Sequence, residues 1–85
     1  MFYTYVLKSR KDLDLYIGST KDLKARFKKH NSGLVQSTRS RAPFLLVYYE
    51  AFLSERDARL REKQLKYRGN SRRQLLLRLK YSLAS

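Results

Sequence analysis

The sequence predicts an α+β fold in which helices pack on a small sheet, in the order β-β-α-β-α-α. Three segments hold the β-branched and aromatic residues that strands favour, namely residues 2–8, 15–18 and 44–52. Helix-start signals follow the second and third of these segments. A chain of 85 residues with 42% hydrophobic content is enough for one domain, residues 1–85, with a modest core.

The first two strands are expected to form a hairpin. Residues 2–8 (Phe-Tyr-Thr-Tyr-Val-Leu-Lys) and residues 15–18 (Leu-Tyr-Ile-Gly) flank the polar segment Lys11–Asp14. A polar connection between two short apolar segments is typical of a turn between antiparallel strands.

The first helix is predicted from a capping box. Ser19 can cap it, and Asp22 three residues later can return the hydrogen bond. The helix should continue to about Asn31, and Gly33 is a suitable stop. Residues 34–42 carry polar and basic side chains and are expected to form an exposed loop.

A continuous apolar strand is predicted after Pro43. Residues 44–52 (Phe-Leu-Leu-Val-Tyr-Tyr-Glu-Ala-Phe) show no polar alternation until their end. Such a segment is typical of a central strand that is covered on both faces.

Two helices complete the chain. Residues Ser54–Asp57 form a second capping box, which opens a helix to about Arg68. Gly69 should stop this helix, and Asn70 or Ser71 should cap the last one. The last helix is rich in leucine, at Leu75, Leu76, Leu77, Leu79 and Leu83.

The charge of the chain indicates a polyanionic partner. Twenty Lys and Arg against seven Asp and Glu give a net charge of +13 at pH 7. Nucleic acid is the favoured partner, because neutralising phosphates releases counterions. A solubilising surface and an acidic membrane are the alternatives. The membrane is disfavoured, since no helix combines a basic face with an apolar face anchored by aromatic residues.

Several functional classes are excluded by composition. The chain has no cysteine, which rules out disulfides, thiolate catalysis and cysteine-bound zinc. The longest apolar segment, residues 42–49, is too short to span a bilayer. No signal peptide is recognised, so a cytoplasmic location is expected.

One arginine and the single histidine fall near the apolar side of the first helix. Leu23 and Phe27 define the buried stripe, and Arg26 and His30 lie on or beside it. An arginine held there could present its guanidinium to a phosphate. Equally, Arg26 could cover the core with its aliphatic stem while His30 is satisfied at the helix end.

A carboxylate interrupts the apolar stripe of the second helix. Ala58, Glu62 and Leu65 lie at positions i, i+4 and i+7, so Glu62 should face the core. A buried carboxylate must be paired or bind a metal. Arg61, Arg59 or another cation could pair with it, while a single carboxylate also suffices for Mg²⁺.

The tyrosines of the hairpin are the remaining candidates. Tyr3 and Tyr5 share one face of their strand, and Tyr16 lies on the next strand. They could simply fill the core. Alternatively, a phenol could face a cleft where nearby cations lower its pKa from about 10 towards the range of a general base.

Several motifs in combination resemble the GIY-YIG nuclease superfamily, most closely its small single-domain bacterial members. The resemblance covers residues 2 to about 80, and no single motif would be specific. The matching motifs are Tyr3-Thr4-Tyr5, Tyr16-Ile17-Gly18-Ser19-Thr20, Leu23-x-x-Arg26-x-x-x-His30, Tyr48-x-Glu50 and Arg61-Glu62-Lys63-Gln64-Leu65-Lys66.

The resemblance implies a three-stranded antiparallel sheet and metal-dependent phosphodiester hydrolysis, as in excision-repair and homing endonucleases. Tyr5 and Tyr16 would be the motif tyrosines, one of which orients or deprotonates the attacking water. Arg26 would stabilise the scissile phosphate, and His30 would assist proton transfer. Glu62 would hold one Mg²⁺ or Mn²⁺ ion.

The match has two departures, and the nucleic-acid contacts rest on charge alone. The first motif reads Tyr-Thr-Tyr, and the family's late asparagine has only Asn70 as a candidate.

DNA is the expected substrate. The rival hypotheses are a non-catalytic nucleic-acid-binding module on the same fold and an RNA-associated structural protein. The candidate backbone contacts are Lys24, Lys28, Lys29, Arg39, Arg41, Arg72 and Arg73.

Overall fold

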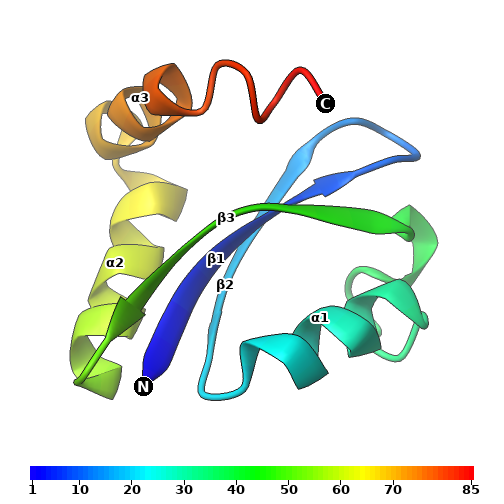
Figure 1. Cartoon of the computed structure of the whole chain (residues 1–85), viewed down its shortest axis with the longest axis horizontal. Coiled ribbons are helices and arrows are strands. Elements are labelled where there is room, and N and C mark those ends of the chain that lie inside the picture. Colours follow the sequence, from blue (N-terminus) through cyan, green and yellow to red (C-terminus); the bar gives the residue numbers. More distant parts are fainter.

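The computed structural model describes all residues, 1–85, and has the predicted order β-β-α-β-α-α (Figure 1). It adds one 3₁₀ turn, η1, before the third strand. The elements are β1 (Phe2–Ser9), β2 (Leu15–Thr20), α1 (Leu23–Asn31), η1 (Arg39–Arg41), β3 (Phe44–Phe52), α2 (Glu55–Tyr67) and α3 (Gly69–Arg78).

The three strands form an antiparallel sheet in the order β2-β1-β3. The central strand is therefore β1, and the prediction that residues 44–52 are central was wrong. The segment Thr4–Leu7 of β1 is almost completely buried, whereas Tyr49 on β3 is 53% exposed. The apolar composition of β3 reflects an edge strand whose first residue, Phe44, is buried, while Leu46 and Tyr49 line an open surface.

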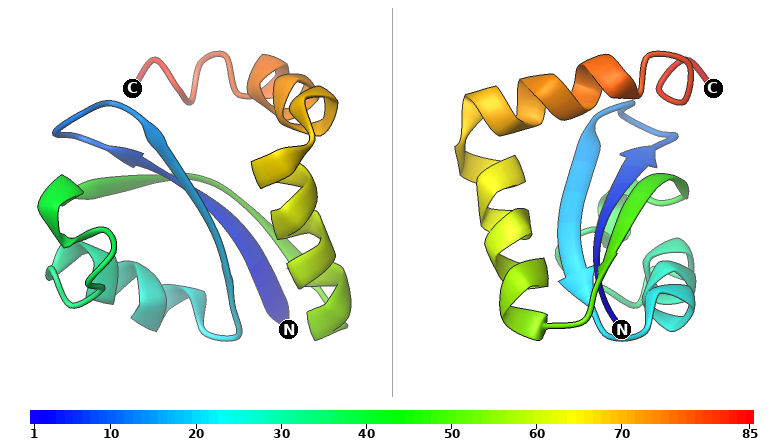
Figure 2. Two further views of the ribbon diagram at one scale, coloured as in Figure 1. Left: turned by 180° about the vertical axis from the view of Figure 1, so that it is seen from behind. Right: turned by 60° about the vertical axis from the view of Figure 1, so that its left-hand side comes forward.

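Helices cover both faces of the sheet. Successive residues of β1 point to opposite faces, so buried side chains lie on each face. Val6 and Ile17 pack against leucines of α2 and α3, and Tyr5, Leu7 and Phe44 pack on the face that α1 covers. Figure 2 shows this arrangement, with α1 on one side of the sheet and α2 and α3 on the other. We call these two sides the α1 face and the α2 face.

The helix starts differ from the predicted capping boxes. β2 continues to Thr20, so Ser19 is a strand residue, and Asp22 itself caps α1 by accepting from the Ala25 amide at 3.1 Å. Ser54 precedes α2 but makes no side-chain capping bond. Ser19, four positions before the first residue of α1, thus belongs to the preceding strand.

The boundary between α2 and α3 was also misassigned. Arg68 lies between the two helices, and Gly69 is the first residue of α3. Asn70 and Ser71 therefore lie inside α3 and do not cap it. Arg68 adopts an extended backbone, and this single residue changes the direction of the chain.

The predicted loop 34–42 is partly a core element. Val35 is 8% exposed and Thr38 only 1% exposed, so the prediction of an exposed loop was wrong at these two positions. η1 follows at once, and Ser9 Oγ donates to the Arg41 carbonyl at 2.6 Å. The loop is thereby fixed against the end of β1 and carries Thr38 into the α1 face.

Candidate active site

A continuous chain of buried hydrogen bonds lies beneath α1. The Tyr5 hydroxyl lies 2.9 Å from His30 Nε2, and His30 Nδ1 lies 2.8 Å from Thr38 Oγ1. Thr38 Oγ1 donates onward to the Val35 carbonyl at 3.4 Å. Because the Thr38 proton is used there, the network assigns donation from Nδ1–H to Thr38 and from the Tyr5 hydroxyl to Nε2.

His30 and Tyr5, the titratable members of this series of hydrogen bonds, are both held in their neutral forms. Burial, followed by the positive charge of Arg26, lowers the pKa of His30 from 6.5 to about 4. Burial raises the pKa of Tyr5 from 10.0 to about 12, which outweighs the lowering effect of the nearby Arg26 guanidinium. The expectation that nearby cations lower a motif-tyrosine pKa was therefore wrong for Tyr5, which stays protonated near neutral pH.

Arg26 and Tyr16 form the more accessible side of the same cluster. Both side chains are half-buried. The Tyr16 ring centroid lies 5.0 Å from that of His30 and 6.3 Å from that of Tyr5. Arg26 is partly exposed beside Tyr5, so its guanidinium can meet a ligand.

Tyr5 and Tyr16 pack closely against Gly18 of β2. A Cβ atom at this position would lie 2.6 Å from Tyr5 Oη and 3.1 Å from Tyr16 Cε2. The distance to Tyr5 Oη is too short for non-bonded atoms, so a larger residue would displace Tyr5. The glycine is required here for close approach of the two tyrosines to the backbone.

Glu62 approaches the same edge strand from the α2 face. Its Oε1 accepts from Ser19 Oγ at 2.7 Å, and its Oε2 accepts from Lys66 Nζ at 2.7 Å. The Glu62 side chain is 21% exposed, which is less buried than the sequence predicted. The predicted ion pair exists, although its partner is Lys66 and not Arg59 or Arg61.

Glu62 is suited to a metal that needs only one protein ligand. No group of three or more histidine or acidic side chains could form a complete metal cage. However, Mg²⁺ keeps several waters and takes its other oxygens from phosphate. A carboxylate has about four acceptor positions, so two accepted bonds leave room for a cation. The groove beside Glu62 has a volume of about 420 Å³ and is lined by Ser19, Arg59, Glu62, Lys63, Lys66 and Tyr67.

The two sides of the site meet electrostatically at β2. The charge of Glu62 contributes to the raised pKa of Tyr5, as does Tyr16, although burial is the larger cause. Ser19, which orients Glu62, directly follows Gly18, which supports Tyr5. The structure brings Tyr5, Tyr16, Arg26 and His30 together in one cluster on the α1 face. Glu62 lies on the α2 face and is linked to this cluster through Ser19, the neighbour of Gly18.

The predicted nucleic-acid contacts do not form one surface. Lys24, Lys28 and Lys29 are exposed on α1, which lies on the α1 face. Arg72 and Arg73 belong to α3, which covers the opposite face (Figure 2). Only the first group lies on the same face as Arg26.

Arg41 is already occupied within the molecule, whereas Arg39 is exposed. Arg41 Nε donates to Asp12 Oδ2 at 2.7 Å, and its Nη2 donates to the Leu15 carbonyl at 3.4 Å. The hydrogen bond from Arg41 lowers the pKa of Asp12 to about 2. Arg41 therefore joins the hairpin turn to η1, and its charge is largely compensated.

Three residues of the site were missed from the sequence. Lys66 lies four positions after Glu62 on a helix, which is a readable signal for an ion pair. Ser19 was assigned to a helix cap, so its role as a donor to Glu62 was hidden. Thr38 lies in a segment without periodicity, and nothing in the sequence indicates that it meets His30.

Comparisons with known proteins agree on one family. Residues 1–75 match the model of the GIY-YIG catalytic domain. A UPF0213 protein of Clostridium perfringens is 46% identical over 67 residues, which cover 78% of this chain and 71% of that protein. The UPF0213 protein BH0048 of Halalkalibacterium halodurans is 39% identical over 79 residues, which cover 92% of this chain and 83% of that protein.

A solved structure extends the similarity to the fold. The solution NMR structure of the UPF0213 protein BH0048 from Bacillus halodurans has a TM-score of 0.58 and 36% identity. The match covers 100% of this chain and 95% of that chain. In addition, none of the helices here has the length and apolar character needed to cross a membrane.

Proposed function

The chain belongs to the GIY-YIG catalytic domain family, and from this premise we propose that it is an endonuclease that hydrolyses nucleic-acid phosphodiester bonds with one divalent metal. We propose DNA as the substrate. Phosphodiester hydrolysis needs a cation, an arginine and a group that orients water. The site offers a residue suited to each of these roles.

One observation carries this proposal. On β2, Gly18 packs against Tyr5 and Tyr16 on the α1 face, and the next residue, Ser19, donates to Glu62 on the α2 face at 2.7 Å. The tyrosine cluster beside Arg26 and the carboxylate thus adjoin consecutive residues of one edge strand. A phosphate bound there would meet Arg26 directly and a metal held by Glu62.

The roles of the two motif tyrosines separate in this proposal. Tyr5 is buried and has a pKa of about 12, so it serves as a neutral donor to His30. Tyr16 is half-buried beside it and is the phenol that can reach an attacking water. We therefore assign the orientation of water to Tyr16, while Tyr5 fixes the position of its neighbours.

His30 acts indirectly, because its side chain has no exposed surface. Its two ring nitrogens are both occupied, by Tyr5 and by Thr38. It is a positioning residue that sets the orientation of the Tyr5 hydroxyl. The neutral imidazole also leaves Arg26 as the one positive charge of this cluster.

Glu62 is the residue that would hold the metal. When bound, Mg²⁺ or Mn²⁺ supplies positive charge to the leaving oxygen of the phosphodiester. Ser19 fixes the orientation of the Glu62 carboxylate, and Lys66 balances its charge. Arg26 would donate to the non-bridging oxygens of the same phosphate.

A cleavage panel tests this proposal. Labelled single-stranded, duplex and branched DNA and the matching RNA are incubated with Mg²⁺, Mn²⁺ or EDTA, with wild type beside Glu62→Ala. We expect metal-dependent cutting that the variant loses by about 100- to 1,000-fold. Cutting in EDTA would contradict the metal requirement, and wild-type cutting by the variant would contradict the role of Glu62.

A non-catalytic nucleic-acid-binding module is the second candidate. The ion pair between Glu62 and Lys66 favours it, because a compensated carboxylate no longer repels a phosphate backbone. This alternative predicts binding without cutting on every substrate of the panel. It also predicts that neither EDTA nor Glu62→Ala changes the affinity.

A further inference from the structure

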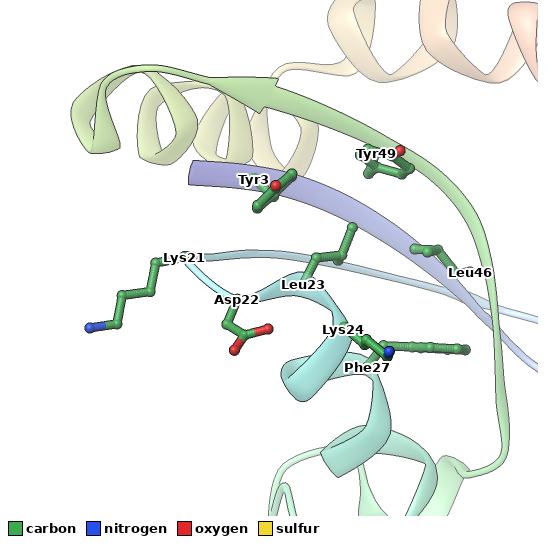
Figure 3. Close-up of a pocket in the computed structure, with 8 residues that line it drawn as sticks. All are labelled: Tyr3, Lys21, Asp22, Leu23, Lys24, Phe27, Leu46 and Tyr49. Atoms are coloured by element: carbon green, nitrogen blue, oxygen red, sulfur yellow. The ribbon is translucent and has the colours of Figure 1, made fainter. Parts of the chain in front are cut away.

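A second concave site lies on the α1 face, beside the catalytic cluster but outside it. It is an open pocket of about 430 Å³ between the first turns of α1 and strands β1 and β3. This volume lies at the lower end of the range for small-ligand sites. Figure 3 shows the lining residues, which are Tyr3, Lys21, Asp22, Leu23, Lys24, Phe27, Leu46 and Tyr49.

The walls of this pocket are aromatic and aliphatic. Tyr3 and Tyr49 project from neighbouring strands, with ring centroids 6.0 Å apart and planes at 65°. Leu23 and Phe27 of α1 are only half-buried, as is Leu46 of β3. Tyr49 is 53% exposed, so an extended aromatic surface here has no partner within the molecule.

The rim of the pocket is cationic. Lys21 and Lys24 are both exposed and form no ion pair. The one carboxylate of the rim, Asp22, already accepts the Ala25 amide at the start of α1. The pocket therefore combines apolar walls for a flat ring with free positive charge for an adjoining anion.

We propose that this pocket binds one unpaired nucleobase of the substrate, with its phosphate held by Lys21 and Lys24. The inference rests on the proposed nucleic-acid substrate and specifies how that substrate is held. A nucleotide is the ligand in which a planar apolar ring is joined to an anion. An apolar side chain of a protein partner would not need the two lysines.

The position of the pocket matches a nucleotide next to the cleaved bond. Tyr3 and Tyr5 lie two residues apart on one face of β1, which is a distance of about 7 Å along a strand. Leu23 and Phe27 flank Arg26 on α1. A base paired within a duplex cannot enter between these side chains, so the bound nucleotide must be unpaired or extruded.

Binding in EDTA tests the pocket without any need for cleavage. One probe is a fluorescein-labelled oligothymidylate, and the other has the same phosphates but abasic sugars throughout. We expect wild type to prefer the base-bearing strand by roughly fivefold or more, as for one stacked base. Tyr49→Ala should lose this preference yet keep its affinity for the abasic strand, and Tyr49→Phe should retain both.

The control variant is Tyr81→Ala, which removes a tyrosine that is 83% exposed near the C-terminus. It should bind both probes like wild type. Equal affinity of wild type for the two probes, or a preference that survives in Tyr49→Ala, would overturn the proposal. Thermal unfolding checks each variant, and Lys21→Ala, in an exposed turn, provides a second variant expected to weaken both probes.

The result separates this inference from the proposed function. If wild type cuts nucleic acid but shows no preference for bases, the nuclease stands and the pocket proposal fails. If it prefers bases and Tyr49→Ala removes the preference while no substrate is cut, the pocket stands and the nuclease proposal fails.

Discussion

The two faces of the sheet hold polar groups in opposite ways. On the α1 face, Tyr5, His30 and Thr38 are fully buried, uncharged and joined by hydrogen bonds. On the α2 face, Glu50 and Glu62 are charged, half-buried and paired with cations. The buried groups of the α1 face are neutral, because charge would be costly there. The carboxylates of the α2 face stay charged because they are paired with cations and partly reached by water.

This difference explains why the site lies at the sheet edge. β2 is an edge strand, so groups from both faces can meet around it at Gly18 and Ser19. The neutral side offers an oriented phenol cluster, and the charged side offers a carboxylate. Variants on each face can test this division of roles.

Arg26→Ala should have the strongest effect on cleavage. Removing the only cation of the α1-face cluster should reduce the cleavage rate by about 100- to 1,000-fold, because charge on the scissile phosphate loses its partner. The side chain is half-buried, so the melting temperature should change little. Single-turnover rates measure the effect, with Lys11→Ala, at an exposed position of the hairpin turn, as the control. A rate similar to that of wild type would contradict the role of Arg26.

Gly18→Ala should damage the cluster through packing. The new Cβ would lie 2.6 Å from Tyr5 Oη, and overpacking of this kind costs about 1–3 kcal/mol. Urea unfolding measures the loss, and cleavage should fall with it because Tyr5 must move. Gly69→Ala is the matched control, since a Cβ there meets no atom within 4 Å. Equal stability of the two variants would show that Gly18 is not a tight contact.

His30 should make the stability depend on pH in a defined window. Its pKa is lowered from 6.5 to about 4 in the folded protein, so the unfolded chain binds the extra proton between these values. The contribution of His30 is complete above pH 6.5 and is lost as the pH falls to about 4, by up to about 3 kcal/mol. The free energy of unfolding of wild type and His30→Gln should be compared on either side of this window, at about pH 4.5 and about pH 7.5.

The variant His30→Gln should show a smaller decrease between these two pH values. The exposed pair of Asp12 with Arg41 does not confuse the comparison, because the pKa of Asp12 is lowered to about 2 and its titration lies below this window. Identical pH profiles for the two proteins would mean that folding does not lower the pKa of His30.

A milder effect is expected for the lysines of α1. Lys28→Ala with Lys29→Ala should reduce the slope of log affinity against log salt by about 0.7 to 0.9 for each phosphate that is no longer neutralised. Arg72→Ala with Arg73→Ala, on the other face, should leave the slope near that of wild type. Titrations between low and physiological salt decide this, and the reverse result would place the nucleic acid on α3.

Sequence patterns predicted the elements of the fold better than their surroundings. The order of strands and helices followed from local composition, and residues 44–52 were placed correctly as a strand. Their position in the sheet was wrong, because apolar composition does not distinguish a buried central strand from an edge that carries an open aromatic pocket.

The candidate site shows the same limit. Helix periodicity correctly placed Arg26 and His30 towards the sheet. It predicted that Glu62 faces the core, whereas the Glu62 side chain is 21% exposed. The contacts of Thr38 and Ser19 depend on long-range folding, which no local pattern records. Likewise, the raised pKa of Tyr5 results from its burial in the central strand, and that burial was not foreseen.

The proposed nuclease requires that Glu62 serve catalysis and not only a structural ion pair. Glu50 is a closely matched control, because its side chain is 24% exposed against 21% for Glu62, and both lie 2.7 Å from a cation. The decisive measurement is the metal-dependent cleavage rate of Glu62→Gln beside Glu50→Gln, with the melting temperature of each. We predict similar small losses of stability but a large loss of cleavage only in Glu62→Gln. Equal cleavage by the two variants would contradict the catalytic role of Glu62.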